Sequence, residues 1–143
     1  MQLPAPGAPR GDYRAAVVSG PWVWVSGQGP VKDGKIVAQG KVGGEVSLAQ
    51  AQLAAQVAML NVLAQAGSAC GGVNRITQCV KTTVYVSSEP GFADQAKVAD
   101  AASGLLAQVF GAERIPARTS VGVFGLPSDI PVMIDAVFEC AAR

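Results

Sequence analysis

Two charged residues interrupt otherwise apolar, strand-like segments in the last quarter of the sequence. Arg118 precedes the run 119–123, and Asp135 lies inside the run 132–137. If these segments pair as a hairpin across the turn 126–131, the two side chains are candidates for one polar site, since a buried charge needs a partner. A guanidinium group binds a carboxylate through two parallel hydrogen bonds, and a nearby carboxylate could move a proton or hold a water molecule. The alternative is that both are structural charges at strand ends.

The composition excludes several classes of function. The chain has 143 residues, which fits one domain over residues 1–143. It contains no histidine, which excludes Ser-His and Cys-His nucleophilic pairs and histidine-ligated metal sites. The net charge is +1 and no basic stripe is visible, so nucleic-acid binding is not expected. Apolar residues make up 50% and charged residues 15%, which predicts a well-buried core and favours contact between subunits.

Three cysteines, Cys70, Cys79 and Cys140, form no Cys-x-x-Cys pair. An odd number without framework spacing is typical of reduced, mostly buried thiols in a cytoplasmic protein. Cys79 has two basic residues nearby in the sequence, Arg75 and Lys81, which could activate a thiol. We favour a structural role for all three cysteines. The first six residues have neither a basic region nor an apolar run, so no secretion signal is expected.

Hydrophobic periodicity and turn residues predict an α+β fold with the element order β-β-α-β-α-β-β. The two helices interrupt the strands, so we expect a mixed sheet with both helices on one face and the other face open. An open apolar face favours oligomerisation. The expected strands are 14–18, 22–26, 78–86, 116–123 and 132–137, the expected helices are 47–67 and 92–110, and a small hairpin is expected at 31–37.

The first expected helix starts with a capping box formed by Ser47 and Gln50, and Gly67 is placed to end it. No charged residue occurs between Glu45 and Arg75. The outer face of this helix could therefore contact another subunit, although its glutamines and asparagine could also solvate it. The same polar residues argue against a membrane span.

The second expected strand carries aromatic residues and ends in glycines. Trp22 and Trp24 alternate along it, so both rings face the same side. We expect both rings to pack in the core, with the wall of a pocket as the alternative. Gly27 and Gly29 indicate either a close approach to the backbone or unusual dihedral angles. No lysine follows and no helix is expected next, so this is not a phosphate-binding loop.

Five segments occur in an order and spacing that one known family shares. They are Val25-Ser26-Gly27-Gln28, 80–86, 116–123, Leu126-Pro127 and Ile134-Asp135-Ala136. Through them the chain resembles the Rid superfamily of reactive-intermediate deaminases, also called the YjgF family and formerly named endoribonuclease L-PSP. The likeness runs from about Gly11 to Glu139, and the five segments together are far more specific than any one of them. Residues 3–6, 40–43 and 90–92 are similar to a longer subgroup of the family.

The resemblance implies a chorismate-mutase-like α+β fold and a homotrimer with its active sites in clefts between subunits. It also implies hydrolysis of 2-imino acids and their enamine tautomers to 2-oxo acids and ammonia. Neither a cofactor nor a metal is implied, because an iminium carbon is already electrophilic. The expected ligand is a small 2-imino or 2-oxo acid.

The same resemblance assigns roles to individual residues. Arg118 matches the family's anchoring arginine and would bind the substrate carboxylate through two hydrogen bonds. Backbone N–H groups near Ser26-Gly27 and Ser120 could share that carboxylate. Asp135 matches the family's acidic residue on the last strand and would position or activate the attacking water. Tyr13 matches a tyrosine near the first strand, as a wall and a hydrogen-bond donor to the nitrogen or the water.

Three positions depart from the family's pattern. Asp100 stands where many members carry asparagine, Ser120 where typical deaminases carry cysteine, and Asp135 where glutamate is usual, which withdraws the carboxylate by about one methylene group. These departures leave open a second class of function, a ligand-binding or regulatory trimer without turnover. An RNA-cleaving translation inhibitor is the third and least favoured, because a nearly neutral chain without histidine offers no evident acid–base pair or phosphate contacts.

Overall fold

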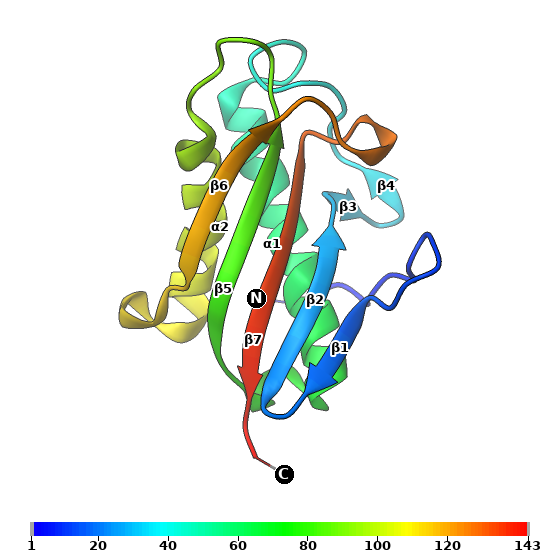
Figure 1. Ribbon diagram of the computed structural model, residues 1–143, viewed down its shortest axis with the longest axis vertical. Coiled ribbons are helices and arrows are strands. Elements are labelled where there is room, and N and C mark those ends of the chain that lie inside the picture. Colours follow the sequence, from blue (N-terminus) through cyan, green and yellow to red (C-terminus); the bar gives the residue numbers. More distant parts are fainter. Residues whose placement is uncertain (1, 143) are drawn as a thin grey trace.

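The computed structural model describes residues 2–142, which form a mixed five-stranded sheet with both long helices packed on one face (Figure 1). The strand order is β1-β2-β7-β5-β6; β5 and β6 run parallel, and the other neighbouring pairs run antiparallel. The α+β architecture is therefore confirmed. The elements are β1 (Ala16–Ser19), β2 (Trp22–Gln28), β3 (Val31–Lys32), β4 (Lys35–Ile36), α1 (Leu48–Cys70), β5 (Ile76–Ser87), α2 (Gln95–Phe110), β6 (Ala117–Val123) and β7 (Val132–Cys140).

The expected hairpin between the last two strands is wrong, because β5 lies between them. Arg118 pairs with Thr82 on one side of β5, whereas Asp135 pairs with Thr83 on the other. Paired residues share a face and consecutive residues alternate, so Arg118 and Asp135 lie on opposite faces of the sheet. The cause is α2, which carries the chain from β5 to β6 as a crossover and so makes these strands parallel neighbours.

The first helix begins as expected and ends later. The Ser47 hydroxyl accepts a hydrogen bond from the Gln50 backbone N–H at 3.2 Å, and the Gln50 side chain accepts one from the Ser47 N–H at 2.8 Å. The closing residue is Gly71, with φ at 89° and ψ at 18°, not Gly67. Gly67 instead allows close packing, since a Cβ there would lie 3.3 Å from the Cα of Val73.

The second helix begins at Gln95 rather than at Phe92. Gly91 has a φ of 88°, which turns the chain ahead of the helix. Phe92 then packs beside Gly43, where an added Cβ would lie 3.2 Å from the ring. Its carbonyl accepts a hydrogen bond from the Gln95 side chain at 2.8 Å, so the helix starts only after this turn.

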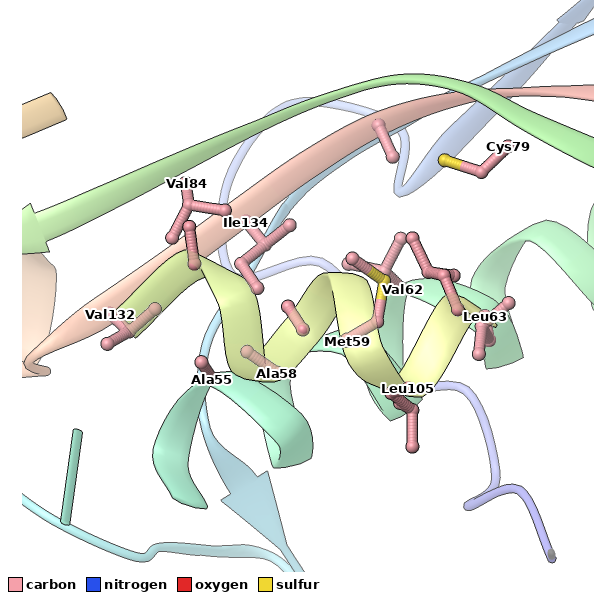
Figure 2. Packing of buried hydrophobic residues seen from close by; sticks show 14 of the residues in the cluster. Ala55, Ala58, Met59, Val62, Leu63, Cys79, Val84, Leu105, Val132 and Ile134 are labelled. Carbon is pink, nitrogen blue, oxygen red and sulfur yellow. The ribbon is translucent and has the colours of Figure 1, made fainter. Parts of the chain in front are cut away.

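The core lies between the two helices and the covered face of the sheet (Figure 2). Helix α1 contributes mainly small side chains there, which lets α2 and the sheet approach it closely. Larger side chains fill the remaining space. The small residues are Ala51, Ala54, Ala55, Ala58 and Ala66, and the largest fully buried ones are Phe138, Met59, Leu63, Leu106 and Ile134.

The N-terminal segment covers part of the uncharged outer face of α1. The Gln65 side chain donates a hydrogen bond to the Gly7 carbonyl at 2.7 Å, and Leu3 packs against the core. Leu53 stays 64% exposed. Helix α1 is long and apolar enough to cross a membrane by composition alone, but 61% of that stretch is buried inside the fold. Its apolar character is therefore that of a core helix.

The opposite face of the sheet is uncovered in the single chain, and the tryptophans lie there rather than in the core. Val23 and Val25 take the buried positions of β2, whereas Trp22 and Trp24 are 38% and 55% exposed. The expectation that both rings pack in the core is wrong for one chain, because the smaller valines fit against α1. We call this surface the open face; by strand register it includes Val17, Ser19, Trp22, Trp24, Lys81, Thr83, Tyr85, Thr119, Val121, Met133, Asp135, Val137 and Glu139.

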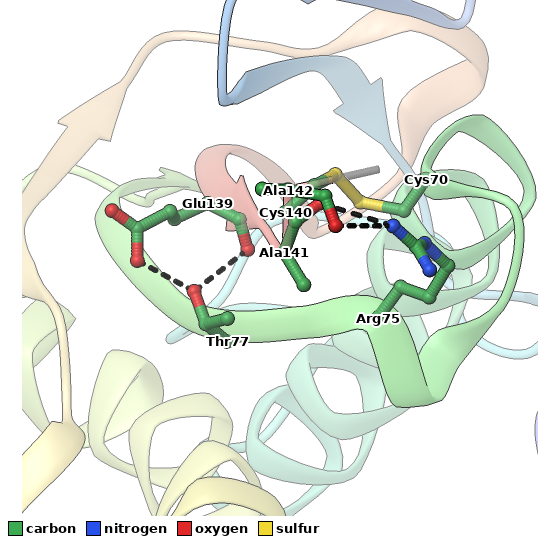
Figure 3. The surroundings of a disulfide bond; sticks show 7 residues. All are labelled: Cys70, Arg75, Thr77, Glu139, Cys140, Ala141 and Ala142. Atoms are coloured by element: carbon green, nitrogen blue, oxygen red, sulfur yellow. Dashed lines mark hydrogen bonds between the residues drawn. A yellow bond between two sulfur atoms is a disulfide. The ribbon is translucent and has the colours of Figure 1, made fainter.

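A disulfide joins Cys70 at the end of α1 to Cys140 at the end of β7, with a Cα–Cα distance of 5.8 Å (Figure 3). The expectation of three reduced thiols is wrong for this pair, whose proximity the sequence spacing does not reveal. Beside it, the Arg75 guanidinium donates to the carbonyls of Ala141 and Ala142 at 3.2 and 2.9 Å. Cys79 is free and buried, and burial raises its pKa to about 12, which makes it unreactive.

We expect reduction of the Cys70–Cys140 disulfide to lower the free energy of unfolding by about 2–4 kcal/mol, because the bond closes a long loop and restricts the unfolded chain. Urea denaturation with and without reductant measures this difference. The double variant Cys70→Ser/Cys140→Ser serves as the control, since reductant should leave its midpoint unchanged. An equal midpoint for wild type in both conditions would contradict the prediction.

Candidate functional site

The structure distributes the six predicted site residues over three places. Tyr13, Ser26 and Gly27 lie together at the end of β2, and Arg118 and Ser120 lie together on β6. Asp135 lies on β7, on the open face. A single chain therefore does not assemble them into one site.

The Arg118 side chain is held by α2. Its Nη1 donates to Asp100 Oδ1 at 2.7 Å and to Ser103 Oγ at 3.1 Å. These acceptors are three residues apart and so share one face of the helix. The Arg118 side chain is 23% exposed. Within residues 2–142 its Nε and Nη2 make no hydrogen bond, so the other edge of the guanidinium fork remains available to a ligand.

The surface between β6 and α2 beside Arg118 is polar. Ser120 and Gly122 follow at alternate positions of the strand and so share the face of Arg118. A Cβ at Gly122 would lie 2.7 Å from Gln95 Nε2 and 3.2 Å from Ser88 Oγ, so glycine lets both side chains approach the strand. Apart from the Asp100 carboxylate, the groups around Arg118 named here are neutral donors and acceptors.

Tyr13 and Gly27 line a pocket of about 290 Å³ at the end of β2, and Ser26 lies beside it. Its walls include Tyr13, Gly27 and Asn61, and the Asn61 amide fixes the strand end by donating to the Gly29 and Val31 carbonyls at 2.9 and 2.8 Å. The Ser26 hydroxyl donates to the Arg14 carbonyl at 2.7 Å, which ties the Tyr13 segment to β2.

Tyr13 is half exposed, and its hydroxyl accepts a hydrogen bond from the Arg10 backbone N–H at 3.4 Å. The hydroxyl hydrogen itself is not used in this contact, so Tyr13 keeps a donor for a ligand. Gly27 is needed for a close approach of another side chain: a Cβ there would lie 2.7 Å from the Met133 sulfur.

Asp135 is engaged within its own chain. The Tyr85 hydroxyl donates to Asp135 Oδ2 at 2.9 Å. Burial raises the pKa of Tyr85, and the hydrogen bond and negative charge of Asp135 raise it further. The phenol therefore stays protonated at neutral pH and keeps the carboxylate oriented across the open face.

Two strands, β7 and β5, separate the Gly27 pocket on β2 from Arg118 on β6. Neighbouring strands lie about 4.8 Å apart, so a small organic acid cannot reach from Arg118 to the Gly27 pocket of the same chain. In the sequence, Asp100 stands out only as a departure from a family pattern, and nothing marks Ser103 as a functional residue. Their three-residue spacing on a predicted helix was the available signal, but nothing in the sequence indicated that this helix packs beside β6.

The chain matches, over residues 1–132, the family model described as "YjgF/chorismate_mutase-like, putative endoribonuclease". This match covers every helix and strand except β7, of which it includes only the first residue. The chain belongs to the YjgF family. The resemblance to the Rid superfamily inferred from its sequence is thereby confirmed, and so is the chorismate-mutase-like fold.

Several individual proteins are similar along nearly their full length. Protein TCP17 of Trypanosoma cruzi is 39% identical over 140 residues, which cover 97% of this chain and 88% of that protein. A crystal structure of a protein of unknown function from Agrobacterium tumefaciens has a TM-score of 0.90 at 38% identity and covers 98% of this chain and 86% of its own. The structure of TdcF from E. coli with bound serine has a TM-score of 0.63 at 29% identity and covers 96% and 94%.

We expect Gly27→Ala to lower the free energy of unfolding by about 1–3 kcal/mol through overpacking against Met133. The double variant Gly27→Ala/Met133→Ala should recover part of that loss, because the side chain in the way is gone. Gly104→Ala is the matched control: Gly104 is exposed on α2 with no atom within 4 Å of its added Cβ. Urea denaturation of the four proteins checks the prediction, and equal losses at Gly27 and Gly104 would contradict it.

Proposed function

We propose that this protein hydrolyses 2-imino acids and their enamine tautomers to 2-oxo acids and ammonia, without a cofactor. The observation that carries the proposal is the state of Arg118. Its Nη1 is fixed by Asp100 and Ser103, while Nε and Nη2 stay free on an edge strand. A guanidinium group oriented in this way suits bidentate binding of a small carboxylate. The serine-bound structure of the related TdcF supports a small amino-acid-like ligand.

The site is proposed to form between subunits of a homotrimer. Strands β1 and β6 are the two edges of the sheet, and the open face between them exposes Trp22 and Trp24. Contacts of one edge with the opposite edge of the next copy generate a closed ring. Such a ring would bring Arg118 of one subunit to the Gly27 pocket of its neighbour. Two subunits would then combine the groups that lie too far apart within one chain.

In the proposed reaction Arg118 holds the substrate carboxylate, and backbone N–H groups near Gly27 and Ser120 share it. Water adds its oxygen to the iminium carbon, and the C=N electron pair moves to nitrogen. The resulting tetrahedral aminoalcohol releases ammonia as its hydroxyl becomes the carbonyl of the 2-oxo acid. Asp135 would take and return the proton of the water, and Tyr13 would donate a hydrogen bond to the nitrogen. Holding the substrate, the water and the catalytic groups in place makes the main contribution to the rate of such a reaction.

A second candidate function is a carboxylate-binding or regulatory trimer without turnover. It is favoured by the position of Asp135, which faces away from Arg118 in its own chain and is held by the Tyr85 hydroxyl. Both readings share the Arg118 anchor. RNA cleavage, which the family description mentions, has least support, because a net charge of +1 provides no basic surface.

A cytoplasmic location is also part of the proposal, because short-lived imines must be hydrolysed where metabolism forms them. The argument from unpaired cysteines no longer supports it, since Cys70 and Cys140 are joined and the cytoplasm keeps most thiols reduced.

Arg118→Ala is expected to lower kcat/KM at least about 100-fold towards 2-iminobutanoate generated in situ, because charge-assisted hydrogen bonds to the carboxylate are lost. Arg118→Lys should recover only part of this loss, since it keeps the charge but not the planar fork. The assay follows formation of 2-oxobutanoate. No acceleration by wild type would favour the binding function, and full activity in Arg118→Ala would show that the anchor is assigned wrongly.

Trp24→Glu is expected to dissociate the trimer and with it the activity, because it places a charge on the open face, which the proposed trimer would bury. Leu53→Glu is the matched control: Leu53 is 64% exposed on α1, on the side of the sheet opposite the open face. Light scattering coupled to size-exclusion chromatography measures the mass. A wild-type monomer, or an unchanged trimer in Trp24→Glu, would contradict the proposed assembly.

A further inference from the structure

The arginine that anchors the proposed ligand is paired with an acid in its own chain. Asp100 Oδ1 lies 2.7 Å from Arg118 Nη1, and the Asp100 side chain is 67% exposed. Its second oxygen, Oδ2, makes no hydrogen bond within residues 2–142. The ion pair therefore leaves two groups without a partner in this part of the chain: one carboxylate oxygen of Asp100, and the Nε and Nη2 edge of the Arg118 guanidinium group.

Two nearby lysines have partners of their own and make no ion pair with Asp100. Lys97 pairs with Asp94 at 3.6 Å, one turn earlier on α2. Lys81 belongs to the open face, where its Nζ donates to Thr119 Oγ1 at 2.7 Å. The local charge around Arg118 is thus one positive and one negative group side by side, a dipole rather than a cationic pocket.

A dipole of this kind discriminates between acids that differ only at the carbon next to the carboxylate. A zwitterion with a 2-amino or 2-iminium group carries a negative and a positive charge on neighbouring groups. Its carboxylate fits Nε and Nη2, and its cationic N–H group can donate to Asp100 Oδ2. A 2-oxo acid brings the carboxylate alone, and Asp100 repels it.

We propose that Asp100 is the specificity residue of the Arg118 site and makes it prefer zwitterionic 2-amino or 2-iminium acids over the corresponding 2-oxo acids. This inference rests on the proposed function and deepens it. In hydrolysis of an iminium acid, the substrate satisfies both charges of the pair and the 2-oxo acid product only one. Asp100 therefore favours release of product.

A purely structural role for Asp100 predicts something different. If the residue only orients Arg118, its loss weakens every carboxylate ligand by the same factor. Asp100→Asn separates the two roles, because the amide oxygen can still accept from Nη1 while the negative charge is gone. Ser103→Ala removes the uncharged acceptor of Nη1 and leaves the charges in place.

The experiment compares binding of L-2-aminobutanoate and 2-oxobutanoate, which differ only in the group on C2, by isothermal titration calorimetry at low salt. The proteins are wild type, Asp100→Asn, Ser103→Ala and, as a matched exposed acid on the same helix, Asp94→Asn. Wild type should bind the amino acid at least about tenfold more tightly than the oxo acid. In Asp100→Asn that ratio should fall towards one, chiefly because the oxo acid binds more tightly. Ser103→Ala and Asp94→Asn should keep the wild-type ratio.

The outcomes separate this inference from the proposed function. A wild-type ratio near one, or an unchanged ratio in Asp100→Asn, overturns the role of Asp100 and leaves the anchor standing. Absence of binding of both acids to wild type, or binding unaltered in Arg118→Ala, overturns the anchor and the specificity role together. Circular dichroism and thermal unfolding identify any variant that fails to fold, and Asp100→Ser then replaces Asp100→Asn.

Discussion

The parallel pairing of β6 with β5 determines where Arg118 can act and separates it from Asp135. It directs Arg118 towards the helices, because Thr82, its neighbour in register, faces the core. It also makes β6 an edge strand, so its second row of backbone groups is unpaired. Arg118 therefore lies at the edge of the sheet, where α2 holds one side of its guanidinium group and the other side is free to bind a ligand.

Local features of the fold could be predicted from the sequence, and pairing between distant strands could not. The capping box at Ser47 and the alternation in β2 depend on residues a few positions apart, so they are visible in the pattern. The crossover that inserts β5 between β6 and β7 depends on packing of α2, which no short pattern encodes. For the same reason Trp22 and Trp24 could be assigned to one face, but not to the open one.

The same difference between local and long-range features applies to the candidate site. The resemblance implied one site for all six residues, and the single chain brings only Tyr13, Ser26 and Gly27 into one region and Arg118 and Ser120 into another. The contact of Arg118 with Asp100 joins a strand to a helix, and no short sequence pattern encodes it. The Cys70–Cys140 disulfide is a further long-range pairing of this kind, between the ends of two elements that are distant in sequence.

The central position of β7 affects the order in which the molecule can be built. Trp22 pairs with Glu139, more than a hundred residues later in the chain. One edge of β5 likewise has no partner strand until β7 has been synthesised. During synthesis, β1 and β2 leave the ribosome long before the strand that links them to β5 exists. Such distant pairing slows folding and leaves unpaired edges exposed. We therefore expect the nascent hairpin to depend on chaperones until β7 inserts and closes the sheet.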